Sequence, residues 1–202
     1  ENRRRLSKNK SKCSPQTTQN IDLISRRSGF KCISTSGFSS ERGNLEILEL
    51  ASLHQDRQVF FIGNSTAADS KFVDDYVQKK NLKNITILET VPYDELHNII
   101  SLMDLGIVQY SKKNINNTLC ASGKIYEFLD LKVPVITSDN ESLIDIIELT
   151  KSGVSGLTLS NAYEDYMEIK GQVENNLESL DVMDLIDNYS SRFLEKLKHL
   201  YY

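Results

Sequence analysis

The chain has 202 residues, of which 39% are hydrophobic and 26% charged, and its formal net charge is −4. This is the composition of an ordinary globular protein, large enough to bury a core without disulfides or metals. The negative charge balance gives no reason to expect nucleic acid as a partner. No apolar run in the sequence approaches the ~20 residues that cross a bilayer.

Cysteine and histidine residues are few and scattered. Cys13, Cys32 and Cys120 form no CxxC pair, so the sequence favours neither a zinc site nor a disulfide framework. A reducing, cytoplasmic compartment is the simplest interpretation. The histidines are equally far apart, and we expect no metal, because a metal site needs convergent ligands.

Residues 1–28 are polar and begin with a basic run that includes Arg3, Arg4 and Arg5. They lack the apolar stretch of a signal peptide, and because Glu1 is not a start methionine we expect the chain to be part of a longer protein. A basic start is compatible with peripheral membrane contact. A solvated linker or tail is the simpler interpretation, and we favour it.

From residue 30 onward, strand and helix patterns alternate. In chain order, we expect a strand at 30–34, a helix at 44–53, a strand at 59–62, a helix at 69–80, a strand at 84–88, a helix at 94–103 and a strand at 105–110. After a polar loop at 111–122, we expect a helix at 123–131, a strand at 133–137, a helix at 141–149, a short strand at 157–159 and helices at 163–173 and 182–200.

The strand segments are short apolar runs such as Val59–Ile62, which suit strands buried on both faces of a parallel sheet. The helical segments repeat apolar residues at a spacing of three or four, and Asp69 or Ser70 is expected to cap the helix at 69–80. This alternation predicts an α/β fold with a doubly wound parallel sheet.

Ligands bind at the carboxyl ends of the strands in such a sheet, so the loops that follow the strands share one functional edge. In the first loop, Gly37 lets the backbone approach a ligand, and the next helix starts with unpaired N–H groups that suit an anion. Arg42 offers a bidentate phosphate contact. On these residues alone, an ordinary turn at Gly37 is the simpler interpretation of the loop. The GxGxxG spacing of dinucleotide-binding proteins is missing.

A second candidate segment is Cys120–Phe128. Gly123 and Lys124 have the order of a P-loop, but Ile125 replaces the required Ser or Thr and the earlier glycine is absent, so we reject that chemistry. Lys124 and Glu127 lie three residues apart and share one side of a helix, where they suit a phosphate and a ribose. An exposed ion pair is the alternative. Farther on, Asp139 is expected either to cap the next helix or to contact a ligand.

The run from Ala121 to Asp139 (ASGKIYEFLDLKVPVITSD) resembles a motif of GT-B glycosyltransferases of the GT4-like group, the glycosyl transferases group 1. That motif consists of Lys, two residues, Glu, an aromatic residue, a helix end, and then Pro-Val-Ile with a small polar residue and Asp. Residues 36–43, 61–63, 91–96 and 103–106 resemble earlier segments of the same family. The resemblance covers residues 30–150 and implies the Rossmann-like, C-terminal half of a GT-B fold.

The resemblance implies a donor-binding site for a nucleotide-diphosphate sugar, with no metal or other cofactor. Glu127 would bind the ribose hydroxyls, Lys124 and Arg42 would neutralise the diphosphate, and the backbone at Gly37 would approach the donor. The loop from Tyr110 to Ser122 would contact the sugar. The implied donor-binding set is Gly37, Arg42, Gly63, Ser122, Lys124 and Glu127, with Tyr110 and Asp139 as further candidates, while catalytic residues are expected in an N-terminal domain.

The implied organisation is a linker or remnant of the N-terminal domain at 1–28, a nucleotide-sugar-binding domain at 29–180 and a C-terminal helix at 181–202. The enzyme class is a hexosyltransferase-like glycosyltransferase of polysaccharide or glycolipid biosynthesis, with a glycan or lipid-linked acceptor. The acceptor domain of the same protein would be the partner of this part, which alone is expected to bind nucleotide and to transfer sugar poorly or not at all.

Three positions depart from the family pattern: Leu119 stands where many members have an earlier glutamate, Phe38 where an arginine is frequent, and Lys132 where a glycine is usual. Two alternatives therefore stay open. One is an isomerase of the nucleotide-sugar 2-epimerase type, which shares the fold, and the other is a non-catalytic nucleotide-sugar-binding module.

Overall fold

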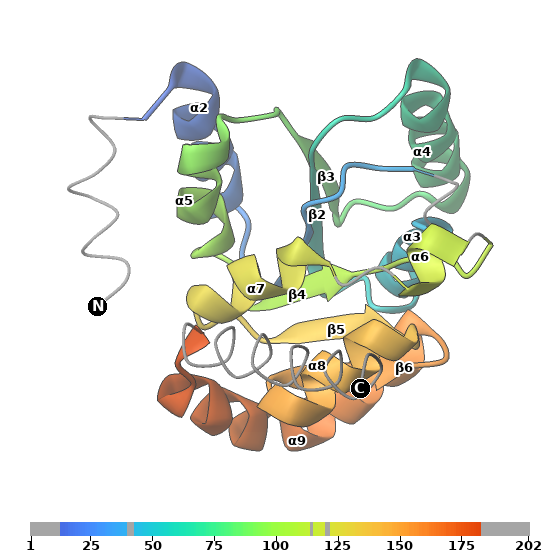
Figure 1. Cartoon of the computed structure of the whole chain (residues 1–202). Coiled ribbons are helices and arrows are strands. Elements are labelled where there is room, and N and C mark those ends of the chain that lie inside the picture. Colours follow the sequence, from blue (N-terminus) through green and yellow to red (C-terminus); the bar gives the residue numbers. More distant parts are fainter. Residues whose placement is uncertain (1–12, 40–42, 114, 120–121, 183–202) are drawn as a thin grey trace.

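The computed structural model describes residues 13–39, 43–113, 115–119 and 122–182 (Figure 1), and for Leu119 it describes the backbone alone. Within these residues, a six-stranded, all-parallel sheet has the order β3-β2-β1-β4-β5-β6. The strands are β1 (Lys31–Ser34), β2 (Gln58–Ile62), β3 (Ile85–Leu88), β4 (Leu105–Val108), β5 (Val135–Ser138) and β6 (Gly153–Gly156). This order confirms the predicted doubly wound sheet, and the strand order reverses between β1 and β4, at the switch point where such sheets bind ligands.

Helices flank the sheet (Figure 1). They are α2 (Pro15–Ser25), α3 (Leu45–Leu53), α4 (Ala67–Lys80), α5 (Leu96–Ile100) after a 3₁₀ turn at Tyr93–Glu95, α6 (Ile115–Leu119), α7 (Gly123–Asp130), α8 (Glu141–Thr150) and α9 (Leu159–Ser179). Right-handed crossovers place α3 and α4 on one face and α5, α7 and α8 on the other. α9 packs against α3, and α2 packs against α5. In the ranges that the structure describes, no helix is both long and apolar enough to cross a bilayer.

The core lies between the central strands and the helices. Ile33, Phe60, Leu105 and Ile136 are completely buried. This explains why these strands are apolar throughout, since helices cover both faces of the sheet. Asn84 is a polar exception: its Nδ2 donates to the backbone carbonyls of Ala51, His54 and Arg57 and so ties the start of β3 to the segment that leads into β2.

The structure corrects the prediction of a solvated tail for part of residues 1–28. Residues 15–25 form α2, with Ser14 as N-cap and Pro15 at the first helical position. Ile21 and Ile24 are buried in the core. An N-cap serine followed by proline is a helix start signal, so the sequence contained the information for this helix.

Four other boundaries differ from the predictions. The loop at 111–122 contains α6; the last strand is β6 at 153–156 rather than at 157–159; α9 is longer than the predicted 163–173; and the helix at 94–103 is shortened to α5. Thr66, not Asp69 or Ser70, caps α4, and its hydroxyl accepts from Asp69 N and donates to the Asp69 carboxylate. The predicted helix at 182–200 lies almost entirely outside the described residues.

Candidate functional site

One side-chain contact connects the two halves of the sheet at the switch point. Lys124, in the first turn of α7, donates from Nζ to Ser36 Oγ, which follows β1, at 3.1 Å. The structure therefore brings together the two segments that the sequence indicated, although they are 88 positions apart. A half-buried ammonium group at the carboxyl edge of a parallel sheet is suited to bind an anion.

Glu127 lies one turn farther along α7 and is half buried. Its Oε1 accepts a hydrogen bond from Tyr93 Oη at 3.0 Å. This bond and the carboxylate charge raise the pKa of Tyr93, which is 76% exposed. Beside the pair, a cavity of about 190 Å³ is lined by residues of α5 and α7, among them Leu96, Ile100 and Glu127. Glu127 thus lines an open cavity and does not lie inside the core.

Gly37 and Gly63 lie in two loops that touch, and a side chain on either glycine would clash with the backbone of the other loop. Both have positive φ, +65° and +126°. A Cβ on Gly37 would lie 2.2 Å from Asn64 O, and a Cβ on Gly63 would lie 2.6 Å from Gly37 N. The loops after β1 and β2 therefore touch through their backbones, which is a structural reason for both glycines. Their contacts with a donor remain predictions.

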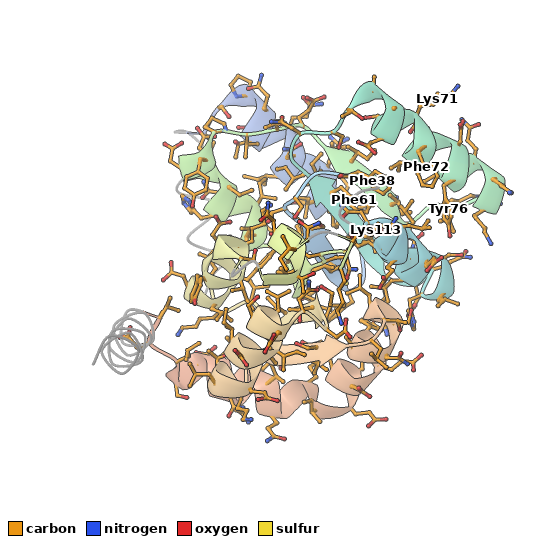
Figure 2. All side chains as sticks on the ribbon, turned by 45° about the vertical axis from the view of Figure 1, so that its right-hand side comes forward. Phe38, Phe61, Lys71, Phe72, Tyr76 and Lys113 are labelled. Carbon is orange, nitrogen blue, oxygen red and sulfur yellow. The ribbon has the colours of Figure 1, made fainter. Side chains whose placement is uncertain are left out.

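Phe38, the residue after Gly37, anchors the same loop in the core. It is 2% exposed, packs edge-on against Phe61 at 5.7 Å and stacks on Phe72 of α4 at 5.9 Å. Figure 2 shows these rings side by side, with Phe72 toward the surface. The backbone N–H of Phe38 donates to Ser65 Oγ at 2.8 Å. The GT4-like group often has an arginine at this position. Here Phe38 packs in the core instead, so the position supplies no charge to a ligand.

The start of α3 has no side-chain cap. Asn44, the N-cap residue, is completely buried, but its Nδ2 donates to Gly37 O at 2.7 Å instead of its oxygen accepting from the helix. This bond holds the Gly37 loop against the helix start. Glu46, in the first turn, is half buried; burial raises the pKa of its carboxyl, and the backbone of Leu159 opposes that rise.

Tyr110 and Ser122 form a buried bridge between the end of β4 and the N-cap of α7. Their hydroxyl oxygens are 3.0 Å apart, and the side chains are 8% and 1% exposed. Tyr110 N also donates to Ser138 Oγ. These contacts fix the geometry around Lys124, while direct contact of either hydroxyl with a ligand remains a prediction.

Asp139 does not cap α8, because Asn140 is the N-cap residue. The Asp139 carboxylate instead forms an ion pair with Lys112 Nζ at 2.7 Å. Lys112 was not singled out from the sequence, although its place just after a strand of the functional edge was a usable signal. The pair joins the loops after β4 and β5, and a ligand contact of Asp139 is still a prediction.

Arg42, predicted to bind phosphate, lies outside the described residues. Within the described parts of the chain, no group of three or more His, Cys, Asp or Glu side chains is placed to hold a metal ion. Independence from metals and other cofactors remains a prediction.

No family model and no curated protein matches the sequence. Solved structures do match. A glycosyltransferase from Rickettsia africae is 17% identical with a TM-score of 0.65, over 95% of this chain and 52% of that chain. Anabaena HepE, solved in complex with UDP-glucose, is 11% identical with a TM-score of 0.65, over 90% of this chain and 53% of that chain.

A third match is to a single domain. The C-terminal domain of the glycosyl transferase group 1 family protein LpcC from Francisella tularensis is 14% identical with a TM-score of 0.62, over 87% of this chain and 93% of that chain. This chain therefore spans about half the length of the first two proteins and nearly all of an isolated C-terminal domain. At such identities the likeness shows the fold, which is that of the C-terminal half of GT-B glycosyltransferases, as the sequence predicted.

Proposed function

We propose that this chain is the donor-binding part of a GT-B glycosyltransferase of the GT4-like group. It binds a nucleoside-diphosphate sugar, of hexosyl type, for transfer to a glycan or lipid-linked acceptor. The observation that supports this most strongly is the contact between Lys124 and Ser36 at the switch point, because it places a cation where an open α/β sheet binds ligands.

The ligand's diphosphate lies beside Lys124 and the uncapped start of α3 in this proposal. The partial positive charge at a helix start and a nearby ammonium group both favour negative charge. The same two groups stabilise the diphosphate as it leaves the sugar, so the reaction proceeds without a metal ion. Arg42 adds a second cation from the loop after β1.

Glu127 accepts both ribose hydroxyls of the nucleotide. Its carboxylate already accepts one hydrogen bond from an exposed hydroxyl, that of Tyr93, which shows that a hydroxyl donor can reach it. The ribose displaces or joins Tyr93, and the nucleobase extends toward the cavity between α5 and α7. Charge-assisted hydrogen bonds of this kind contribute about 1.5–3 kcal/mol each.

Transfer itself needs an acceptor-binding part. The chain spans about half of the full-length glycosyltransferases that it resembles, 52% and 53% of their lengths. We therefore expect nucleotide binding from this chain and little or no transfer, and we place the reaction in a polysaccharide or glycolipid pathway at the cytoplasmic side of a membrane.

The test is calorimetric titration of the chain with UDP, GDP, UDP-glucose and GDP-mannose, for wild type and for Glu127→Ala. Because the variant loses two charge-assisted hydrogen bonds to the ribose, its affinity for the nucleotide that binds should fall by about a hundredfold or more. Glu164→Ala, which removes an exposed carboxylate from α9, is the matched control and should bind as wild type does.

Two outcomes would contradict the proposal. One is the absence of binding to all four nucleotides by a chain whose folding is verified by circular dichroism. The other is binding that Glu127→Ala leaves unchanged. Tight binding with no transfer by a longer protein that includes an acceptor domain would favour the non-catalytic binding module.

A further inference from the structure

Three buried side-chain oxygens without a hydrogen-bond partner lie on the two segments that flank the switch point. They are Thr35 Oγ1 after β1, Asn44 Oδ1 at the start of α3 and Gln109 Oε1 directly after β4. A buried acceptor without a donor costs about 1–3 kcal/mol and is uncommon in native proteins. A ligand that donates hydrogen bonds at this edge would explain the two amide oxygens, and the Thr35 hydroxyl could donate to or accept from the same ligand.

The backbone of β4 determines where Gln109 points. A Cβ on Gly106 would lie 2.7 Å from the Phe128 ring of α7, so position 106 faces α7. Because side chains alternate along an extended segment, Gln109 faces the opposite side of the sheet, toward α3. A Cβ on Gly43 would lie 3.2 Å from Gln109 Nε2, which confirms this placement at the start of α3. Gln109 itself is 3% exposed.

The proposed ribose and phosphate contacts reach the carboxyl edge of the sheet from the face opposite to Gln109. Glu127 and Lys124 are on α7, at one face of the sheet, and Lys124 meets Ser36 at the carboxyl edge itself. Gln109 and Asn44 follow on the other side of that edge. A nucleotide sugar with its ribose at Glu127 and its diphosphate at Lys124 would extend its sugar, rather than its base, across this edge toward the side on which Gln109 lies.

The unpartnered atoms also indicate which part of the ligand they meet. Amide oxygens only accept hydrogen bonds, and Asn44 Nδ2 is already occupied by Gly37 O. Phosphate oxygens are acceptors too and cannot satisfy the two amide oxygens, whereas the Thr35 hydroxyl can donate its own proton. Sugar hydroxyls can, because each carries an O–H donor. The required partner is thus a hydroxyl-rich group beside the diphosphate.

We propose that Gln109 is a specificity-determining residue that accepts a hydrogen bond from a hydroxyl group of the transferred sugar, with Asn44 Oδ1 as a second acceptor. The inference rests on the proposed function, because it takes a nucleotide sugar as the ligand. It goes beyond that function in assigning the sugar subsite to a residue outside the resembling motif. A donor whose sugar lacks the matching hydroxyl leaves Gln109 Oε1 unpaired and binds more weakly.

The test compares each nucleotide with its own sugar conjugate. Calorimetry gives the dissociation constants of UDP and UDP-glucose, and of GDP and GDP-mannose, for wild type and for Gln109→Met, which keeps the side-chain volume but removes the acceptor. For the pair that binds wild type, we expect the variant to lose about tenfold in affinity for the conjugate, the value of one buried hydrogen bond. Affinity for the free diphosphate should stay within about twofold of wild type, since the diphosphate makes no contact with the amide.

The matched control is Gln58→Met. Gln58 Oε1 is also buried without a partner, but it lies at the first residue of β2, on the opposite edge of the sheet. This variant should leave both affinities unchanged. If Gln109→Met does not fold, Gln109→Asn, which keeps the amide and withdraws it by one methylene, should show the same selective loss.

The results separate the two hypotheses. Nucleotide binding with an equal effect of Gln109→Met on the diphosphate and on its conjugate, or with no effect on either, would overturn the assignment of Gln109 and leave the proposed function intact. The same holds if Gln58→Met reproduces the selective loss. Absence of any nucleotide binding by wild type would overturn both.

Discussion

Replacement of Gly37 by alanine tests whether the loop after β1 has the backbone contact that the structure shows. Gly37 has φ +65°, in the left-handed region, and its added Cβ would lie 2.2 Å from Asn64 O and 3.0 Å from the carbonyl carbon of Gly63. These neighbours are backbone atoms, so no side-chain rotation can make room. The loop after β1 or the loop after β2 must therefore move.

The expected cost has two parts. An alanine in the left-handed region costs about 1–2 kcal/mol, and overpacking against a fixed backbone costs about 1–3 kcal/mol. The loss of unfolded-state freedom offsets about 0.4–1 kcal/mol of this. The net destabilisation is about 2–4 kcal/mol, and for a domain of this size it corresponds to a fall in Tm of about 5–15 °C.

Thermal unfolding followed by circular dichroism measures this fall. Gly171→Ala is the matched control, since Gly171 lies inside α9 and an added Cβ would meet nothing within 4 Å. Alanine there should raise stability by about 0.5–1 kcal/mol, because glycine weakens a helix interior. A Gly37→Ala protein as stable as wild type would refute the close approach of the two loops.

Three further predictions concern side-chain contacts that hold the fold together. The pKa of the Glu95 carboxyl is lowered by hydrogen bonds from Thr17 and Ser14, so its stabilisation is present above the ordinary carboxyl pKa and is lost as the pH falls. Glu95→Gln should therefore lower Tm at pH 7, and the two proteins should converge in acid, as a pH series of melting curves would show. Asn84→Ala leaves three backbone carbonyls without their donor and should cost about 3 kcal/mol in urea unfolding. A double-mutant cycle of Tyr110→Phe and Ser122→Ala should give a coupling energy of about 1 kcal/mol, and additivity would show that the hydroxyls do not interact.

The central strands could be predicted from the sequence because burial on both faces leaves only apolar residues. Val59–Ile62 and Leu105–Val108 are such runs, and both are strands in the structure. β6 was placed incorrectly for the converse reason: its sequence is GVSG, with little apolar content. Gly153 is required there, because its Cβ would lie 1.9 Å from Val135 O, and no local pattern reveals a contact of that kind.

Some residues of the candidate site could be predicted because they follow a strand directly or start the next helix. Lys124, Glu127 and Gly37 follow from strand ends and helix starts, and the structure puts all three at the carboxyl edge. Gln109 could not be found in this way. Gln109 is a candidate because its buried side-chain oxygen has no hydrogen-bond partner. Whether a buried oxygen has a partner depends on the surrounding structure and not on the residue type.

The side chain of Asn44 links local folding to the proposed function. Asparagine is among the best N-cap residues, yet here its amide holds Gly37 O and leaves the start of α3 without a side-chain cap. A helix that was optimised for stability alone would have that cap. The N–H groups of Glu46 and Ile47 instead donate to the backbone carbonyls of Gly43 and Asn44, and the bond of the Asn44 amide to Gly37 O fixes the loop after β1 against the helix start. Such a local departure from the most stable arrangement is expected where a ligand completes the structure, and Asn44 lies at the same carboxyl edge of the sheet as Lys124 and Gln109.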